Sequence, residues 1–142
     1  MARGDGLGRV FNIVPTADAV EVNLVGASAV SFVLVGADTY TLNESIGAAG
    51  TPQALSCISR YSTNANANGS TAWVDFDLEA EGDPVSEIEV TAGVAVFTVR
   101  ADQLTDGYTH VSVSGAATGL VTAITHDLLA GRKPSNLPPL GA

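Results

Sequence analysis

Two histidines, one cysteine and many serines are the residues of this sequence that could support nucleophilic catalysis. His110 and His126 fall in predicted late strands, and Asp127 follows His126 directly. A Ser–His–Asp arrangement needs a serine marked by its surroundings, such as a G-x-S-x-G turn, and the sequence contains none. Cys57 lies in the apolar run ALSCI, which is typical of a buried structural thiol. We therefore assign no catalytic residue and expect a protein that is not an enzyme.

A row of carboxylates in the segment 70–80, STAWVDFDLEA, could in principle bind calcium. Its period-two pattern gives one strand face with Val74, Phe76 and Leu78 and another with Trp73, Asp75, Asp77 and Glu79. Calcium requires about six to eight oxygens that converge from a loop, whereas a strand presents its carboxylates in a line. The pattern favours a solvated acidic face, so we assign no metal ligand and no cofactor. Trp73 on that face could stack on a sugar, although a packed tryptophan is the commoner case.

Short apolar runs with period-two alternation, separated by Gly, Asn, Asp and Ser, position these residues. The predicted strands lie at 19–25, 29–35, 38–44, 54–62, 70–80, 87–90, 93–101, 108–114 and 120–128. The run AVSFVLV (29–35) is apolar enough for a strand buried on both faces, and NANANGS (64–70) predicts an exposed hairpin tip. No segment of ten or more residues has a convincing helical period. The sequence predicts one all-β domain, a two-sheet sandwich of jelly-roll or Greek-key type with about eight strands.

Charge is distributed unevenly along the 142 residues. Charged residues make up only 15% of the chain and the mean hydropathy is +0.27, which suits a surface largely covered by partners. Residues 10–131 contain fourteen acidic residues and two arginines, which leaves a net charge of −12. Such a body repels the phosphates of nucleic acid. We also expect no membrane association, because no apolar run approaches about 18 residues and the first residues lack the apolar core of a signal peptide.

The two ends of the chain carry most of its basic residues. Four of the six lie there, namely Arg3, Arg9, Arg132 and Lys133. The last eleven residues, RKPSNLPPLGA, cannot form a helix or a central strand, but Leu137 and Leu140 favour apolar pockets. Prolines limit the entropy that such a segment loses on docking. We therefore predict an N-terminal arm or edge strand at 1–17, a sandwich body at 18–131 and a docking arm at 132–142.

The last third of the chain resembles small virion structural proteins of tailed phages that infect actinobacteria. One shared motif is an L-x-D-G-Y/F turn between strands, here Leu104, Asp106, Gly107 and Tyr108. The other is the ending HDL…R-x-P-x-N-LP-x-L, here His126, Asp127, Leu128, Arg132, Pro134, Asn136, Leu137, Pro138 and Leu140. These motifs are structural, and no active site is carried over with them. The resemblance implies a capsid decoration or cement protein.

Together these observations predict a non-enzymatic phage virion protein, made in the host cytoplasm and bound to the outer surface of the capsid. Its expected partners are the major capsid protein, copies of itself, or both. The expected partner-binding residues lie in the two arms: Arg3, Arg9, Phe11, Arg132, Lys133, Pro134, Leu137, Pro138 and Leu140. One alternative is a tail tube or tail-terminator component. An alternative of another class is a carbohydrate-binding module that uses Trp73, Tyr61 or Tyr108 as a stacking platform.

Overall fold

A computed structural model gives the fold of this chain. It describes residues 11–16, 19–47, 50–80, 82–115 and 119–128, and it gives only the backbone for 11–16, 80, 127 and 128. Within these ranges, eleven strands form two sheets in which every strand pair is antiparallel. The predicted two-sheet β-sandwich is confirmed. The described residues contain no helix that is long and apolar enough to cross a membrane.

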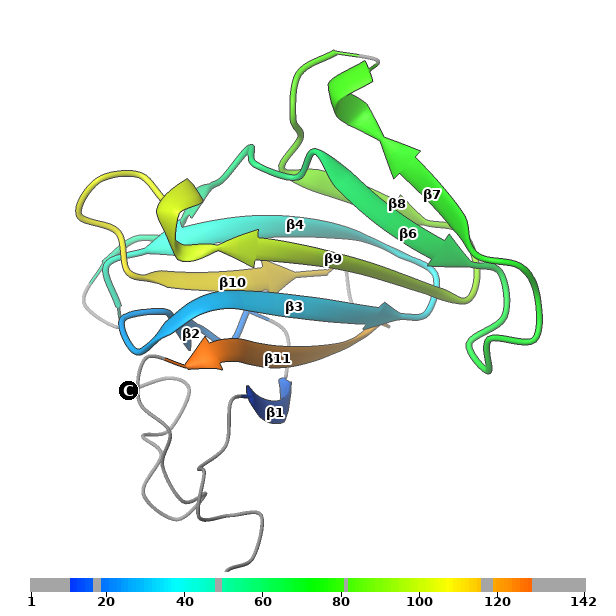
Figure 1. The fold of residues 1–142 in the computed structure, drawn as a ribbon, viewed down its shortest axis with the longest axis horizontal. Coiled ribbons are helices and arrows are strands. Elements are labelled where there is room, and N and C mark those ends of the chain that lie inside the picture. Colours follow the sequence, from blue (N-terminus) through cyan, green and yellow to red (C-terminus); the bar gives the residue numbers. More distant parts are fainter. Residues whose placement is uncertain (1–10, 17–18, 48–49, 81, 116–118, 129–142) are drawn as a thin grey trace, which may run out of the picture.

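The first sheet has six strands. In spatial order they are β1 (Phe11–Thr16), β11 (Leu120–Leu128), β3 (Ala27–Val35), β9 (Val94–Arg100), β6 (Arg60–Asn64) and β7 (Val74–Asp77). The N-terminal strand β1 therefore forms one edge and the hairpin β6–β7 the other (Figure 1). The exposed segment 65–70 connects β6 to β7, which confirms the predicted hairpin tip.

The second sheet has five strands. They are β2 (Val22–Asn23), β10 (His110–Ser114), β4 (Asp38–Ser45), β5 (Gln53–Ala54) and β8 (Glu87–Val90), with β5 and β8 pairing at opposite ends of β4. Two short 3₁₀ helices, η2 (Leu78–Ala80) and η3 (Ala101–Gln103), follow β7 and β9.

Eight of the strands follow the jelly-roll order. One sheet contains the run β1-β11-β3-β9 and the other contains the strands β2-β10-β4-β8, so the chain winds back and forth between the two layers. Strands β5, β6 and β7 are an insertion between β4 and β8. This insertion supplies one whole edge of the six-stranded sheet, and it overlaps the predicted strands at 54–62 and 70–80, the first of which is divided between β5 and β6.

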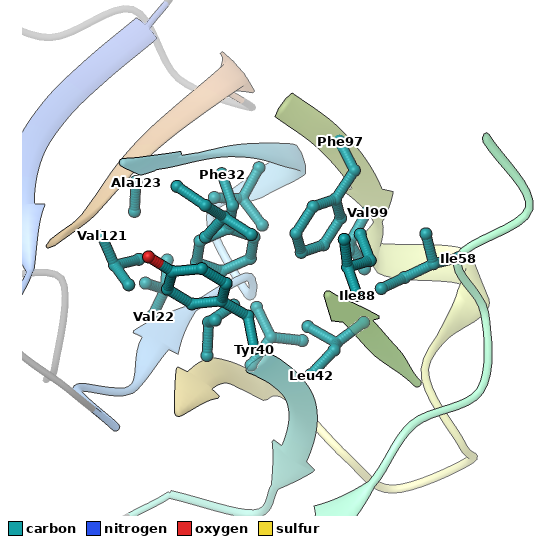
Figure 2. Packing of buried hydrophobic residues seen from close by; sticks show 14 of the residues in the cluster. Val22, Phe32, Tyr40, Leu42, Ile58, Ile88, Phe97, Val99, Val121 and Ala123 are labelled. Carbon is teal, nitrogen blue, oxygen red and sulfur yellow. The ribbon is translucent and has the colours of Figure 1, made fainter. Parts of the chain in front are cut away.

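Large apolar side chains fill the space between the sheets (Figure 2). The rings of Phe32 and Phe97, from neighbouring strands, lie 5.4 Å apart between centroids. Tyr40 is 2% exposed and donates its hydroxyl to the carbonyl of Gly36 at 3.0 Å, so its one polar atom is satisfied inside the core. The described members of the core cluster extend from Val22 to Ala123.

Strand β3 differs from its predicted environment. Val30, Phe32 and Leu34 are buried, but Val33 and Val35, which alternate with them, are only half-buried. One face of β3 contacts the core and the other faces outward, so the expectation of a strand buried on both faces is wrong. The continuous apolar run instead gives the six-stranded sheet an outer face with few charges.

Candidate functional site

A cleft of about 550 Å³ opens between β6 and β9. The two strands pair only where Ser62–Asn64 of β6 meets Val94–Val96 of β9. Beyond Val96, β9 continues to Arg100 with β3 as its strand partner, while β6 leads away from it. Figure 1 shows the two strands separating in this direction.

The residues that precede β6 explain why these strands separate. The backbone N–H of Leu55 donates to the carbonyl of Leu42 at 3.0 Å, and Ile58 exchanges backbone hydrogen bonds of 3.0 and 3.1 Å with Val85. Both interactions hold this part of the chain toward the second sheet. The segment therefore cannot also pair with the far end of β9, and the cleft remains between them.

Aromatic side chains form one wall of the cleft. Tyr61 and Phe76 lie opposite each other in the β6–β7 register and stack at 4.7 Å between centroids, with 8° between the ring planes. Phe97 from β9 also lines the cleft. Because β7 lies beyond the area that the second sheet covers, Phe76 remains 39% exposed. An exposed aromatic stack inside a cleft is a surface suited to covering by a ligand or partner.

Charged and polar pairs surround this aromatic wall. Arg60 contacts Asp77 at 2.9 Å, and Arg100 contacts Asp102 at 3.0 Å. These four side chains are well exposed, so both ion pairs contribute little to stability. Ser62 donates its hydroxyl to Asp75 at 2.6 Å. The rim can therefore exchange its partners for those of a ligand at small cost.

Cys57 also lines the cleft, and its thiol is not an activated nucleophile. Burial, together with the negative charge of Glu44, raises the pKa of Cys57 to about 11. A thiol with this pKa remains protonated near neutral pH, and thiolate is the reactive form. Cys57 is half-buried and packs against the core cluster, so it is less buried than the sequence predicts.

The histidines lie apart from the cleft. His110 is 9% exposed, and its Nδ1 lies 2.8 Å from the hydroxyl of Thr109. Nε2 of His126 lies 3.1 Å from Oγ of Ser31, which in turn lies 2.7 Å from Oγ1 of Thr98. These three polar side chains lie on β11, β3 and β9. Of the three, Thr98 lines the cleft, whereas Ser31 and His126 do not. The side chain of Asp127, the third member of the arrangement considered above, lies outside the described residues.

The acidic row does not form the predicted line along a strand. Strand β7 ends at Asp77, and Glu79 lies in η2, where its backbone N–H donates to Asp77 at 3.2 Å. All four residues of β7 are exposed, so Val74 and Phe76 do not face a core as the alternation predicts. Among the residues that the structure describes, no group of three or more His, Cys, Asp or Glu side chains could hold a metal ion.

The aromatic residues considered for sugar stacking are not gathered at one site. Tyr61 lines the cleft, whereas Trp73 and Tyr108 do not. Sequence reasoning did not identify Phe76 and Phe97 as cleft residues. The strong turn signal at 64–70 could have predicted that the two flanking strands pair. It could not have predicted the register that places Tyr61 opposite Phe76. The divergence of β6 from β9 has no local sequence signal.

The predicted partner-binding residues lie almost entirely outside the described part of the chain. Eight of them lie within residues 1–10 and 129–142, outside the described part of the chain, and Phe11 is described only in its backbone. The backbone nevertheless shows where the end segments attach. Phe11 pairs with His126 at the edge of the six-stranded sheet, so the two end segments leave the body at neighbouring points.

Comparisons with known proteins give little further guidance. No protein-family model matches this chain, and no curated protein matches it by sequence. Among solved structures, the crystal structure of SPBc2 prophage-derived protein YomS is similar with a TM-score of 0.37 and 11% sequence identity, covering 82% of this chain and 95% of that one. At this level of similarity, the match establishes neither a common fold nor a common function.

Proposed function

We propose that this chain is a non-enzymatic structural protein of a phage virion that acts as a capsid decoration or cement protein. In this proposal it binds the outer surface of the shell, with the major capsid protein or copies of itself as partners. The resemblance of its C-terminal third supports the virion assignment. The jelly roll is compatible with it, since capsid proteins use this architecture, although a fold alone does not specify a function.

The observation that carries the proposal is the common origin of the two end segments. Because Phe11 lies opposite His126, residues 1–10 and 129–142 both continue from one end of the β1–β11 edge. These segments contain four of the six basic residues, while the body between them is acidic. The molecule therefore has one pole from which two basic segments can reach an acidic neighbour.

Stabilisation of a shell would follow from the apolar residues of these segments. Each docked arm contributes about 25 cal/mol per Å² of apolar surface that it buries. Leu137 and Leu140 supply such surface, and the neighbouring prolines reduce the entropy lost on docking. The small gain per copy is multiplied by the number of copies on a particle.

The test compares phage particles that lack the protein with the same particles after addition of either the full chain or a chain ending at Gly131. We expect the full chain to bind and to raise the temperature at which the particles release DNA. The shortened chain should bind weakly and leave that temperature unchanged. Unfolding of the shortened chain, followed by circular dichroism, is the control, and the core residues from Val22 to Ala123 lead us to expect an intact body. Unchanged particle stability with the full chain would reject the cement role.

A further inference from the structure

The cleft between β6 and β9 combines an aromatic wall with a strand that has an open edge. Phe76 and Tyr61 form the wall, and within the described part of the chain residues 97–100 of β9 pair with β3 alone, although the backbone N–H of Arg100 donates to Gln103. Aromatic-lined grooves bind proline-rich segments in extended conformation, and open strand edges bind extended backbone. The cleft therefore has the features of a receptor for an extended, proline-rich peptide.

From this geometry we infer that the cleft binds the chain's own C-terminal segment, residues 132–140, in the free protein. The segment RKPSNLPPL contains three prolines, which favour an extended conformation before docking. Ser135, Asn136 and Leu137 stand between prolines and retain backbone N–H groups that can donate to the open edge of β9. Leu137 and Leu140 supply apolar side chains for the aromatic wall.

The end of β11 lies close enough to the cleft for this docking. His126 pairs with Ala29, and Ala29 pairs with Arg100 at the far end of the cleft. Strand β11 is thus two strands away from β9, and the open edge of β9 lies on the side away from β11, one further spacing along, at about 14 Å. The six residues from 129 to 134 can span about 20 Å when extended, so the residues from Ser135 onward can reach this edge. A connection this short gives an effective concentration in the millimolar range, so even weak contacts keep the segment docked.

The charges at the rim also fit this occupant. Arg60, Arg100, Asp75 and Asp77 line the cleft, and Asp102 beside it pairs with Arg100, so these five side chains together carry one negative charge in excess. Arg132 and Lys133 carry two positive charges at the start of the segment. The exposed ion pairs of the rim can rearrange to accommodate them because each contributes little to folding.

This inference concerns the free chain and does not depend on whether the protein decorates a capsid. Docking in its own cleft would keep the arm on the body until an assembly partner competes for it. Failure of the particle experiment above would leave the inference intact, and failure of the experiment below would leave the decoration proposal intact.

Disulfide trapping tests the inference, because Cys57 lines the cleft and is the single cysteine of the sequence. A Leu137→Cys variant of the full chain is oxidised at low protein concentration. A disulfide requires the two Cα atoms to approach within about 7 Å. We expect an internal disulfide, seen as the loss of both free thiols in a species that remains monomeric on a non-reducing gel. Persistence of both thiols, or a covalent dimer from docking in a second copy, would overturn the inference.

Two variants show whether the cleft itself directs the cross-link. Phe76→Ser in the Leu137→Cys background removes the exposed ring of the wall and should slow formation of the disulfide about tenfold. Val74→Ser is the matched control, since Val74 is 52% exposed on the same strand but does not line the cleft. This control should leave the rate unchanged, and equal rates in all three proteins would contradict the inference.

The natural sequence offers an independent measurement that needs no added cysteine. In the full chain, the docked segment should shield Cys57 from a thiol reagent, whereas a chain ending at Gly131 should react several-fold faster. Glu44, whose charge helps to raise the pKa of Cys57, is present in both chains, so the comparison reports how far the segment buries and covers the thiol. Equal reaction rates would show that the segment does not cover the cleft.

Discussion

Glu44 is a carboxylate inside the sandwich, where it connects three separate parts of the chain. It is 1% exposed, and it accepts hydrogen bonds from Nε2 of Gln53 at 2.7 Å and from the backbone N–H of Thr105 at 2.8 Å. Burial raises the pKa of Glu44, but the hydrogen bonds from Thr105 and Gln53 outweigh it, so the pKa is lowered overall. The folded state therefore favours the charged form of this side chain.

We predict that Glu44→Gln destabilises the protein by about 1–3 kcal/mol at pH 7. The new side-chain NH2 group would face either the amide of Gln53 or the backbone N–H of Thr105, and each of these is itself a hydrogen-bond donor. Since the folded pKa is below the ordinary value of 4.5, the contribution of Glu44 is present above that value and is lost as the pH falls through the folded pKa. Urea unfolding from pH 7 to pH 3 should show the wild-type advantage shrinking below pH 4.5. Glu89→Gln, at an exposed position, is the control and should have little effect. An advantage that does not depend on pH would contradict this account.

The position of Glu44 follows from the sequence, but its role does not. The alternation in DTYTLNE places Glu44 on the same face as Tyr40 and Leu42, and that face is buried. A carboxylate can occupy this face only if donors reach it, and its donors come from residues 53 and 105. These three residues meet only after the two sheets have packed, so no local pattern could reveal the network.

At the scale of the elements, the β6–β7 hairpin is held to the jelly roll by contacts that leave no room for larger residues. Gly93, which precedes β9, has a φ of 78°, and a Cβ at this position would clash with the backbone carbonyl of Asn64 at the end of β6. Asn64 is 1% exposed, and it closes the hairpin loop by donating from Nδ2 to the carbonyl of Thr71 at 2.8 Å. Gly93 thus allows the backbones of β9 and the hairpin to approach each other.

We predict that Gly93→Ala lowers the free energy of unfolding by about 3 kcal/mol. Alanine would be strained in the left-handed backbone conformation at this position, and its Cβ would clash with backbone atoms, which cannot rotate away as a side chain can. Gly69→Ala is the matched control, since Gly69 has a φ of 69° but open space around it. It should cost only about 1–2 kcal/mol from strain alone. Thermal and urea unfolding of the two variants measure the difference. Equal losses would mean that the close approach at Gly93 has no energetic role.

The strand pattern predicted most elements, but it failed where an element lies outside the sandwich. In β4 and β9, alternation and burial agree because one face of each strand packs against the core between the two sheets. In β7 the same kind of alternation predicts a buried face, yet Val74 and Phe76 are exposed because none of the described strands of the other sheet covers them. Alternation indicates which residues share a face, whereas the cover over that face depends on topology.

At the scale of the whole molecule, the order of the strands sets where the charges lie. Turn spacing and alternation were sufficient to predict a sandwich, but the jelly-roll order depends on pairs such as β1 with β11, which join the two ends of the chain. This pair brings the basic end segments to one pole of an acidic body. Composition predicts the arms, but it could not predict that the two end segments leave the body at neighbouring points, because this follows from the pairing of β1 with β11.

The same arrangement predicts how the protein behaves in solution. With a net charge of −9, copies of the chain repel one another unless the basic arms find specific sites. Removing Arg132 and Lys133 by ending the chain at Gly131 takes away two positive charges, so the remaining protein should associate even less. Light scattering on both chains measures this directly.

We expect a monomer or a trimer for the full chain and a folded body for the shortened one, as decoration of a shell requires. A hexameric ring formed by the full chain would instead favour a tail tube or tail terminator, because a closed ring is the form in which such components assemble.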